Sequence, residues 1–230
     1  MSRGVIFSDV DGTFLDEAGA VPFQLQWLVE VASKWRVIFA SSRTSADLRA
    51  LQSRVGWQDW AIAEDGAVIV SPAGDEEVLG LEREVIEARA RDSGAWAEVA
   101  ELLPVTTGIR RASVLLPRLV AEDPDFVEFR ARILSAGLRC SPGGRWATLT
   151  GGASKGRAAS ILMTRLQADG AIAVGNDEND ESLFRSVAKS FVIRNHDGHH
   201  PRLAAVPGAT LLQSSGPLGW KEMIGALHPR

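Results

Sequence analysis

A short apolar run near the amino terminus ends abruptly in two carboxylates. Residues 5–8 read Val-Ile-Phe-Ser, and Asp9, Val10, Asp11 and Gly12 follow directly. Such a run bounded by a turn signal is typical of a buried strand in a parallel sheet, and these sheets bind ligands beyond the carboxyl ends of their strands. Two carboxylates at roughly 4 Å repel by about 4 kcal/mol at an effective dielectric of about 20, so the pair favours a cation, a proton or both. Mg²⁺ would meet this demand, whereas an isolated Asp-x-Asp-Gly is equally typical of a polar turn.

A second polar loop follows the apolar residues 37–40. It contains Ser41, Ser42, Arg43 and Thr44, directly before a predicted helix. Hydroxyls and backbone N–H groups at a strand-to-helix junction form a natural phosphate cradle, and Arg43 can add a bidentate clamp for an oxyanion. A plain helix N-cap would use the same residue types.

Two further loops open predicted helices in the last third of the chain. Residues 151–156 read Gly-Gly-Ala-Ser-Lys-Gly, and residues 175–180 read Gly-Asn-Asp-Glu-Asn-Asp after the apolar residues 171–174. A lysine in a first helical turn opposes the helix dipole, so Lys155 is an oddity that a function would explain, although a surface charge is the ordinary alternative. Carboxylate and amide oxygens beyond one strand suit a hard cation such as Mg²⁺, and an N-cap accounts for only one of them.

The composition is that of an ordinary globular protein and disfavours two classes of partner. Hydrophobic residues make up 45% of the 230 positions, enough for a packed core, and the formal net charge is −4. This balance offers no basic footprint for nucleic acid or an anionic membrane. No apolar run approaches the roughly 20 residues of a membrane span, and only residues 2–4 separate the first Met from the first predicted strand, so we expect a cytoplasmic protein, monomeric by default. The single cysteine, Cys140, excludes an internal disulfide and a Cys-rich metal site.

Strand and helix signals alternate in the first and last thirds of the chain, which predicts parallel βαβ units. We expect an α/β fold in which residues 1–80 and 150–230 form a Rossmann-like parallel-sheet core. Residues 81–149 show an α+β pattern with a Gly-rich hairpin signal, and we expect them to form an inserted cap subdomain. The predicted core strands are residues 5–8, 37–40, 60–63, 68–70, 171–174, 190–193 and 210–212, and the core helices are 22–33, 45–54, 155–167, 180–187 and 218–227. The predicted cap elements are helices at 82–103 and 125–136 and strands at 112–116, 138–141 and 145–150.

The four loops resemble, in order and spacing, the four motifs of the haloacid dehalogenase superfamily. The insertion between the second and third loops is similar to the α+β cap of its sugar-phosphatase branch. Within that branch, residues 37–44 and 63–67 are most similar to mannosyl-3-phosphoglycerate phosphatases. The resemblance covers the whole predicted core, whereas no motif of the predicted cap matches.

The resemblance implies a Mg²⁺-dependent phosphatase that acts on a small phosphate ester through an aspartyl phosphate. Asp9 would be the nucleophile, and Asp11 would be the general acid and then the general base. Ser41 and Lys155 would hold the transferring oxygens. The resemblance implies metal ligands at Asp9, Asp11, Asn176 and Asp180 and substrate contacts at Ser42, Arg43 and Asn179.

Two positions depart from the superfamily pattern. The fourth motif usually begins Gly-Asp, whereas Asn176 stands here. Its amide oxygen can still bind Mg²⁺, or Asp177 substitutes and Asp180 binds a metal-bound water or pairs with Lys155. Glu64 and Asp65 precede Gly66 where Glu-Asn-Gly is usual, which leaves the role of this turn open.

Residues facing the leaving group carry no motif. Arginines of the predicted cap could grip a second anionic group, although surface charge is the more common fate of such residues. The candidates are Arg110, Arg111 and Arg145, with Trp146 and Thr148 nearby. His196, His199 and His200 form a cluster that could bind a metal, but we favour a solvated loop, and Asn195 beside it could face the site.

The sequence leaves three other functions open. A phosphomutase or a trehalose-phosphate phosphatase would use the same chemistry, but their Gly-Gly-Asn-Asp and Gly-Asp-Asp-x-Thr-Asp versions of the fourth motif are absent. A catalytically silent sugar-phosphate sensor is the third, and Asn176 keeps it open.

Overall fold

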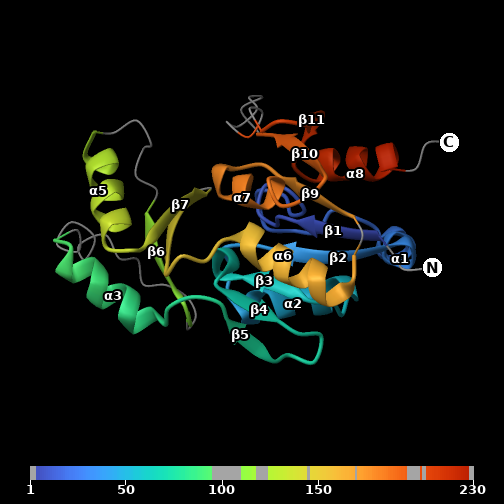
Figure 1. Ribbon diagram of the computed structural model, residues 1–230. Coiled ribbons are helices and arrows are strands. Elements are labelled where there is room, and N and C mark those ends of the chain that lie inside the picture. The colour runs from blue at the N-terminus through green and yellow to red at the C-terminus, as the bar shows by residue number, and fades with distance from the viewer. Residues whose placement is uncertain are drawn as a thin grey trace.

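The structure is a computed structural model. It describes residues 4–94, 110–117, 124–143, 146–168, 170–195, 203 and 206–227. Two sheets lie side by side, each covered by helices (Figure 1). The predicted fold class, an α/β core with a mostly parallel sheet and a smaller α+β unit, is confirmed.

The larger sheet has eight strands in the order β11-β10-β9-β1-β2-β3-β4-β5. All neighbours pair in parallel except β3 with β4 and β4 with β5. Ser8 at the end of β1 pairs with Phe39 on β2 and Val174 on β9, so the loops after these three strands leave the sheet at one edge. The strands are β1 Gly4–Ser8, β2 Trp35–Ala40, β3 Ala61–Ala63, β4 Val68–Val70, β5 Glu76–Val78, β9 Ala171–Gly175, β10 Lys189–Arg194 and β11 Ala209–Ser215.

Helices cover both faces of this sheet. Ile6 on one face of β1 belongs to a core shared with three helices, and Phe7 on the other face belongs to a core shared with two. Both faces of the strand are therefore buried, which explains why its sequence is apolar throughout and not alternating. The first core contains α1 Leu25–Lys34, α2 Ser45–Val55 and α8 Gly216–Leu227, and the second contains α6 Lys155–Leu166 and α7 Glu181–Phe184.

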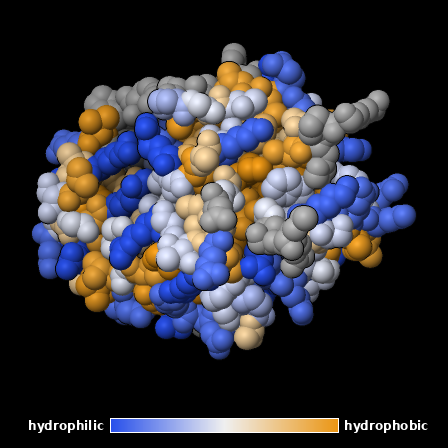
Figure 2. Space-filling model, turned by 45° about the vertical axis from the view of Figure 1, so that its right-hand side comes forward, coloured by the Kyte–Doolittle hydropathy of each residue, from blue (hydrophilic) through white to orange (hydrophobic). Residues whose placement is uncertain are grey.

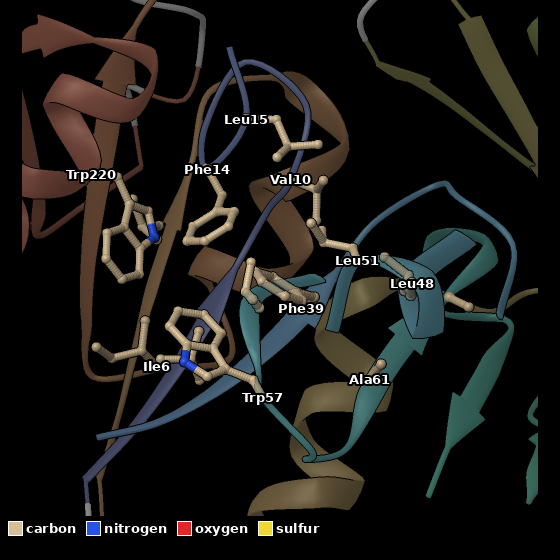
Figure 3. Close-up of a cluster of buried hydrophobic side chains, with 14 of the residues drawn as sticks. Ile6, Val10, Phe14, Leu15, Phe39, Leu48, Leu51, Trp57, Ala61 and Trp220 are labelled. Atoms are coloured by element: carbon tan, nitrogen blue, oxygen red, sulfur yellow. The ribbon is translucent and has the colours of Figure 1, made fainter. Parts of the chain in front are cut away.

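An aromatic cluster fixes the loop that follows β1. Phe14 projects from this loop into the first core, where its ring lies 4.9 Å from Phe39, 5.4 Å from Trp57 and 5.2 Å from Trp220 (Figure 3). The Trp220 indole N–H also donates to Ser8 Oγ at 2.9 Å. Buried aromatic pairs with tilted or edge-on geometry add to the energy of area burial, so the loop is held at both ends.

The smaller unit is a three-stranded antiparallel sheet, β6-β8-β7, backed by two helices. Its elements are α3 Arg83–Asp92, β6 Ser113–Pro117, α5 Pro124–Ser135, β7 Arg139–Gly143 and β8 Trp146–Thr150. Alternate residues such as Cys140, Ala147 and Leu149 pack against the helices, which lie on the side away from the core (Figure 1). The opposite residues, among them Ser113 and Ser141, leave a hydroxyl-bearing face. We call this unit the cap; the division of the chain at residues 81–149 stays a prediction.

Four details differ from the sequence prediction. The helix expected at 22–33 begins only at Leu25, because Phe23 packs its ring on Phe14 from an extended segment. The helix expected at 82–103 ends at Asp92, since Gly94 takes a left-handed conformation and donates to the Arg91 carbonyl; residues 95–103 lie outside the described part. Strand β5 was not expected, and the helix expected at 180–187 is a 3₁₀ turn, Glu178–Asp180, followed by the short α7.

Surface hydrophobicity is scattered. Leu25 and Val29 on α1 and Leu134 on α5 are exposed. On the face drawn in Figure 2, apolar residues lie among hydrophilic ones. Within the described residues, no helix combines the length and the apolar character that crossing a bilayer requires.

Candidate active site

A buried lysine lies between two buried carboxylates at the carboxyl edge of the core sheet. Lys155 Nζ is 2.7 Å from Asp9 Oδ1 and 2.7 Å from Asp180 Oδ1. The Lys155 and Asp180 side chains are 0% exposed, and that of Asp9 is 8% exposed. The first, third and fourth polar loops thus meet in one ionic triad, although Asp9 and Lys155 lie 146 positions apart in the chain.

The backbone around each member of the triad explains its position. The Asp9 N–H donates to the Val174 carbonyl at 2.9 Å, which continues the pairing of β1 with β9. Lys155 is the first residue of α6, and Ser154 caps that helix by accepting from the Arg157 N–H. This placement shows why a lysine stands in a first turn: two buried anions outweigh its unfavourable interaction with the helix dipole.

Asp180 is fixed from the other side by its own loop. Its Oδ2 accepts from the backbone N–H groups of Asn176 and Asp177 at 3.1 and 3.3 Å. Both carboxylate oxygens of Asp180 are therefore engaged inside the protein. The geometry matches the alternative in which Asp180 pairs with Lys155.

Burial and the neighbouring charges both shift the pKa values of the three triad residues. Desolvation raises the pKa of Asp9, against the opposing influence of Lys155. Desolvation also raises the pKa of Asp180 to about 7, and the Asp9 charge adds to the increase. Burial alone would lower the pKa of Lys155, but Asp180, Asp9 and Asp65 raise it above its ordinary value. The lysine therefore remains a cation next to a carboxylate that binds protons more readily than a solvated one.

Asp11 lies beside this triad and is held by the second loop. Arg43 donates to both of its carboxylate oxygens, from Nε at 2.9 Å and from Nη2 at 2.7 Å. The Asp11 side chain is 56% exposed, and Arg43 retains 32% exposure, so a ligand can reach the pair from solvent. The hydrogen bond to Asp11 is the main cause that raises the pKa of Arg43, with burial acting against it.

Ser41 and Ser42 come directly after β2, as the sequence predicts. Ser41 is buried, and its Oγ accepts from the Arg43 N–H at 3.2 Å. Thr44 caps α2 in a capping box with Asp47. The cap therefore uses Thr44, and Ser41 is left beside Arg43 for another role.

One end of the Asn176 side-chain amide lies among oxygens. It is 3.1 Å from the Asp11 carbonyl oxygen, 3.2 Å from Asp9 Oδ2 and 3.1 Å from Thr13 Oγ1. Assigned as nitrogen, this end donates to all three; assigned as Oδ1, it accepts from Thr13 and completes a set of oxygens that only a cation can share. The Asp177 carboxylate is instead used to cap the next turn.

The Asp9 carboxylate, the Asp11 carbonyl and the Asn176 amide oxygen fit Mg²⁺ in chemical type. A carboxylate, a backbone carbonyl and an amide are hard ligands that Mg²⁺ accepts together with water. Among the residues that the structure describes, no group of three or more His, Cys, Asp or Glu side chains could hold a metal. The candidate set contains a single such side chain, Asp9, so it depends on Asn176 and on the Asp11 backbone.

The turn after β3 contributes two buried carboxylates whose role the sequence left open. Glu64 accepts from the Arg111 N–H at 2.8 Å, the Ala112 N–H at 3.0 Å and Ser113 Oγ at 2.6 Å, which fastens the start of β6 to the core. Asp65 accepts from Asn179 Nδ2 at 3.1 Å. The only sequence signal for this turn was a pair of acids after an apolar strand.

The remaining residues predicted from the sequence lie in different parts of the cap and core. Arg110 is buried where the cap contacts the core. It donates to the Ser42 carbonyl at 2.9 Å and to Ser113 Oγ at 3.1 Å. Arg111 is paired with Glu76 on β5, four strands from β1, so the structure does not bring its side chain to the triad. Thr148 is buried opposite Ser141, Trp146 begins β8, and Asn195 Oδ1 lies 3.4 Å from the end of the Asn176 amide that faces away from Asp11. Arg145, His196, His199 and His200 lie outside the described residues.

Comparison with known proteins finds a similarity to one family over part of the chain and a shared fold over nearly all of it. Residues 6–90 match the family model described as haloacid dehalogenase-like hydrolase. A Thermoplasma acidophilum protein of known structure has a TM-score of 0.78 at 16% identity over 98% of each chain. Sucrose-phosphatase from Synechocystis, solved with sucrose and phosphate, has a TM-score of 0.73 at 19% identity over 98% of each chain. A haloacid dehalogenase-like hydrolase from Bacillus subtilis has 0.72 at 18% identity over 98% of each chain. At these identities the solved structures show a shared fold.

Proposed function

We propose that the chain is a Mg²⁺-dependent phosphatase that hydrolyses a small sugar phosphate or phosphorylated glycoside through an aspartyl phosphate. The observation that carries the proposal is the buried triad, in which Lys155 contacts Asp9 and Asp180 at the edge where Asp11 and Ser41 also lie. A fixed cation beside a reactive carboxylate is what phosphoryl transfer requires, because the protein mainly positions the phosphate and neutralises its charge.

In the first step, a carboxylate oxygen of Asp9 attacks phosphorus in line with the ester bond. The P–O ester bond breaks, the leaving oxygen takes a proton from Asp11, and Asp9 becomes an aspartyl phosphate. Asp11 accepts both donors of Arg43 in this structure, so the pair must separate before Asp11 can carry that proton. An incoming phosphate is an anion that competes for the same guanidinium.

In the second step, Asp11 takes a proton from water, and the oxygen of that water attacks phosphorus. The bond to Asp9 breaks, inorganic phosphate leaves, and both carboxylates return to their starting states. Lys155 and Ser41 hold the phosphate oxygens through both steps. The Asp9 carboxylate, the Asp11 carbonyl and the Asn176 amide would hold Mg²⁺, which when bound neutralises charge between the attacking carboxylate and the phosphate.

The substrate class rests on two supports. The cap face that meets the core carries hydroxyls, including Ser141 and Thr148, which suit a polyhydroxylated leaving group. A solved relative of the same fold is a sucrose-phosphatase. Mannosyl-3-phosphoglycerate is the first compound to assay, and Arg110, which donates to the Ser42 carbonyl from the cap side, is the candidate cation for its carboxylate.

The test is release of inorganic phosphate from a panel of phosphorylated sugars in the presence of Mg²⁺. Asp9→Asn is expected to fold normally, judged by circular dichroism and thermal melting, and to release no phosphate. Asp75→Asn, an acid-to-amide change at an exposed turn, is the matched control and is expected to keep full activity. Full activity of Asp9→Asn would refute the mechanism.

A second candidate is a sugar-phosphate sensor that does not turn its ligand over. The position of Asn176 favours it, because an amide nitrogen 3.1 Å from the Asp11 carbonyl donates hydrogen bonds to the oxygens that would hold a cation and offers the cation no ligand of its own. Titration calorimetry distinguishes the two. A sensor binds the sugar phosphate in Mg²⁺ with no phosphate released over hours.

A further inference from the structure

The turn Glu64–Gly66 combines an unusual backbone with a buried acid. Glu64 and Asp65 have φ values of 51° and 58°, and Gly66 has 97°. Left-handed backbone is strained for a non-glycine residue, and residues held this way cluster at functional sites. Asp65 is only 1% exposed, so the chain accepts both the backbone cost and the burial of a carboxylate at this position.

The neighbours of Asp65 come from three separate elements. Asn179 of the fourth loop donates to it from Nδ2 at 3.1 Å. The hydroxyl of Ser141 on cap strand β7 and the positive charges of Lys155 on α6 and Arg139 on β7 act on it and favour its ionised form. Burial raises the pKa of Asp65, and all four of these neighbours act in the opposite direction. Each offers a donor or a positive charge, so the surroundings are built for the carboxylate form.

This arrangement determines which way the Asn179 amide faces. A carboxylate only accepts hydrogen bonds, so the amide must present its nitrogen to Asp65 and its Oδ1 in another direction. No residue in the described part of the chain donates to that Oδ1. The amide also packs against Gly143, at the end of β7, so both the core and the cap border it.

We propose that Asp65 is a positioning residue that fixes the Asn179 amide so that Oδ1 accepts a hydrogen bond from a hydroxyl of the substrate's leaving group. The inference rests on the proposed phosphatase function and deepens it. It assigns the substrate class as phosphate esters with a free hydroxyl near the ester, that is, polyol or sugar phosphates. Esters without hydroxyls would leave this acceptor unpaired when the cap excludes water.

The location of Asn179 supports this assignment. It precedes Asp180, whose carboxylate touches Lys155, so the acceptor is one residue from the triad that holds the phosphate. On the cap side, Ser141 pairs in register with Thr148 on β8, and both are buried with their hydroxyls on the face toward Asp65. A leaving group placed between these surfaces meets a fixed acceptor from the core and hydroxyls from the cap.

The test compares two substrates in two proteins. Glucose 6-phosphate offers hydroxyls, and 4-nitrophenyl phosphate offers none. In Asp65→Asn the new amide can present either end to Asn179, so the orientation of Asn179 is no longer fixed. We expect kcat/KM for glucose 6-phosphate to fall about tenfold more than kcat/KM for 4-nitrophenyl phosphate, mostly through KM, as for one lost hydrogen-bond partner. Asp92→Asn, an exposed acid-to-amide change in the cap, is the control and should not alter the ratio of the two.

A second variant keeps the proposal falsifiable if Asp65→Asn is poorly stable. The exchange Asp65→Asn with Asn179→Asp conserves net charge and reverses the pair, and the new carboxylate at 179 still presents an acceptor to the substrate. We expect it to recover at least about a third of the lost selectivity, which a merely structural role of Asp65 would not produce.

The outcomes distinguish a failure of the role proposed for Asp65 from a failure of the proposed phosphatase function. Equal losses on both substrates in Asp65→Asn, or a wild-type protein that hydrolyses 4-nitrophenyl phosphate but no polyol phosphate, would overturn the role of Asp65 and leave the phosphatase in place. A folded wild-type protein that hydrolyses neither ester in Mg²⁺ would overturn the proposed function, and the inference with it.

Discussion

Lys155 and Asp180 form an ion pair of 2.7 Å in which neither side chain has any exposure to solvent. Asp9 shares the same ammonium at 2.7 Å, so one cation balances two buried anions. Removing one member of a buried pair leaves an uncompensated charge, which is far more costly than losing a surface pair. The triad is therefore a structural centre of the core as well as the candidate site.

Replacing Lys155 by Met tests whether the triad stabilises the folded core. We expect Lys155→Met to lower the free energy of unfolding by about 3–5 kcal/mol, and the double variant with Asp180→Asn to recover part of that loss. Lys34→Met breaks an exposed pair with Glu30 and should cost at most about 1 kcal/mol. Urea denaturation of the four proteins measures the differences. A loss at Lys155 as small as that at Lys34 would contradict the buried arrangement.

The sequence locates the four loops because each follows an apolar run. Parallel strands buried on both faces are apolar throughout, as in residues 37–40 and 171–174, so the points where they end are easy to find. Convergence of the loops then follows from topology alone, since carboxyl ends of parallel strands share one edge. Lys155 gave a further signal through its unfavourable place in a first helical turn.

The remaining features had no such signal. Strand β5 is an edge strand of sequence Glu-Glu-Val, and only its pairing with β4 makes it a strand. Asp65 is buried because its backbone turns through the left-handed region, which neither hydrophobic periodicity nor composition reveals. Arg110 looked like a surface cation and is buried, because Ser42 and Ser113 from two different units accept its hydrogen bonds. Long-range partners of this kind cannot be read from local sequence.

Glu64 is expected to hold the cap to the core. Its two carboxylate oxygens accept three hydrogen bonds from residues 111–113, so Glu64→Gln places an amide nitrogen against at least one backbone donor. We expect a loss of about 1.5–3 kcal/mol and faster hydrogen exchange at the Arg111 and Ala112 amides. Glu84→Gln on the exposed side of α3 is the control. Unchanged protection at both amides would show that Glu64 does not fasten this segment.

Gly66 lies where the turn after β3 passes the start of α6. Its φ is +97°, and an added Cβ would collide with the backbone of Ser154 and Lys155. Gly56 has a φ of +72° but open space around it, so Gly56→Ala isolates the conformational strain. We expect Gly56→Ala to cost about 1–2 kcal/mol and Gly66→Ala about 3 kcal/mol or more. Thermal melting compares them, and equal losses would mean that the approach of the two backbones is looser than described.

The raised pKa of Asp65 predicts how its replacement responds to pH. Burial is the main cause that raises this pKa above 3.8, so the native state binds the proton more tightly than the unfolded chain does. Stability linked to this group is complete below pH 3.8 and is lost as pH rises through the native pKa. Asparagine does not titrate and escapes that loss. The melting temperature of Asp65→Asn relative to wild type should therefore become more favourable from pH 4 to pH 8.

Glu222 supplies a control of opposite sign for this measurement. Partial burial would raise its pKa, but hydrogen bonds from the Gln213 and Ser214 backbone lower it below 4.5. Its stabilising contribution is therefore present above pH 4.5 and is lost as pH falls through the native pKa. Glu222→Gln should be least stable relative to wild type near neutral pH and should approach it in acid. If both variants shift in the same direction with pH, the Asp65 carboxylate does not titrate as its surroundings require.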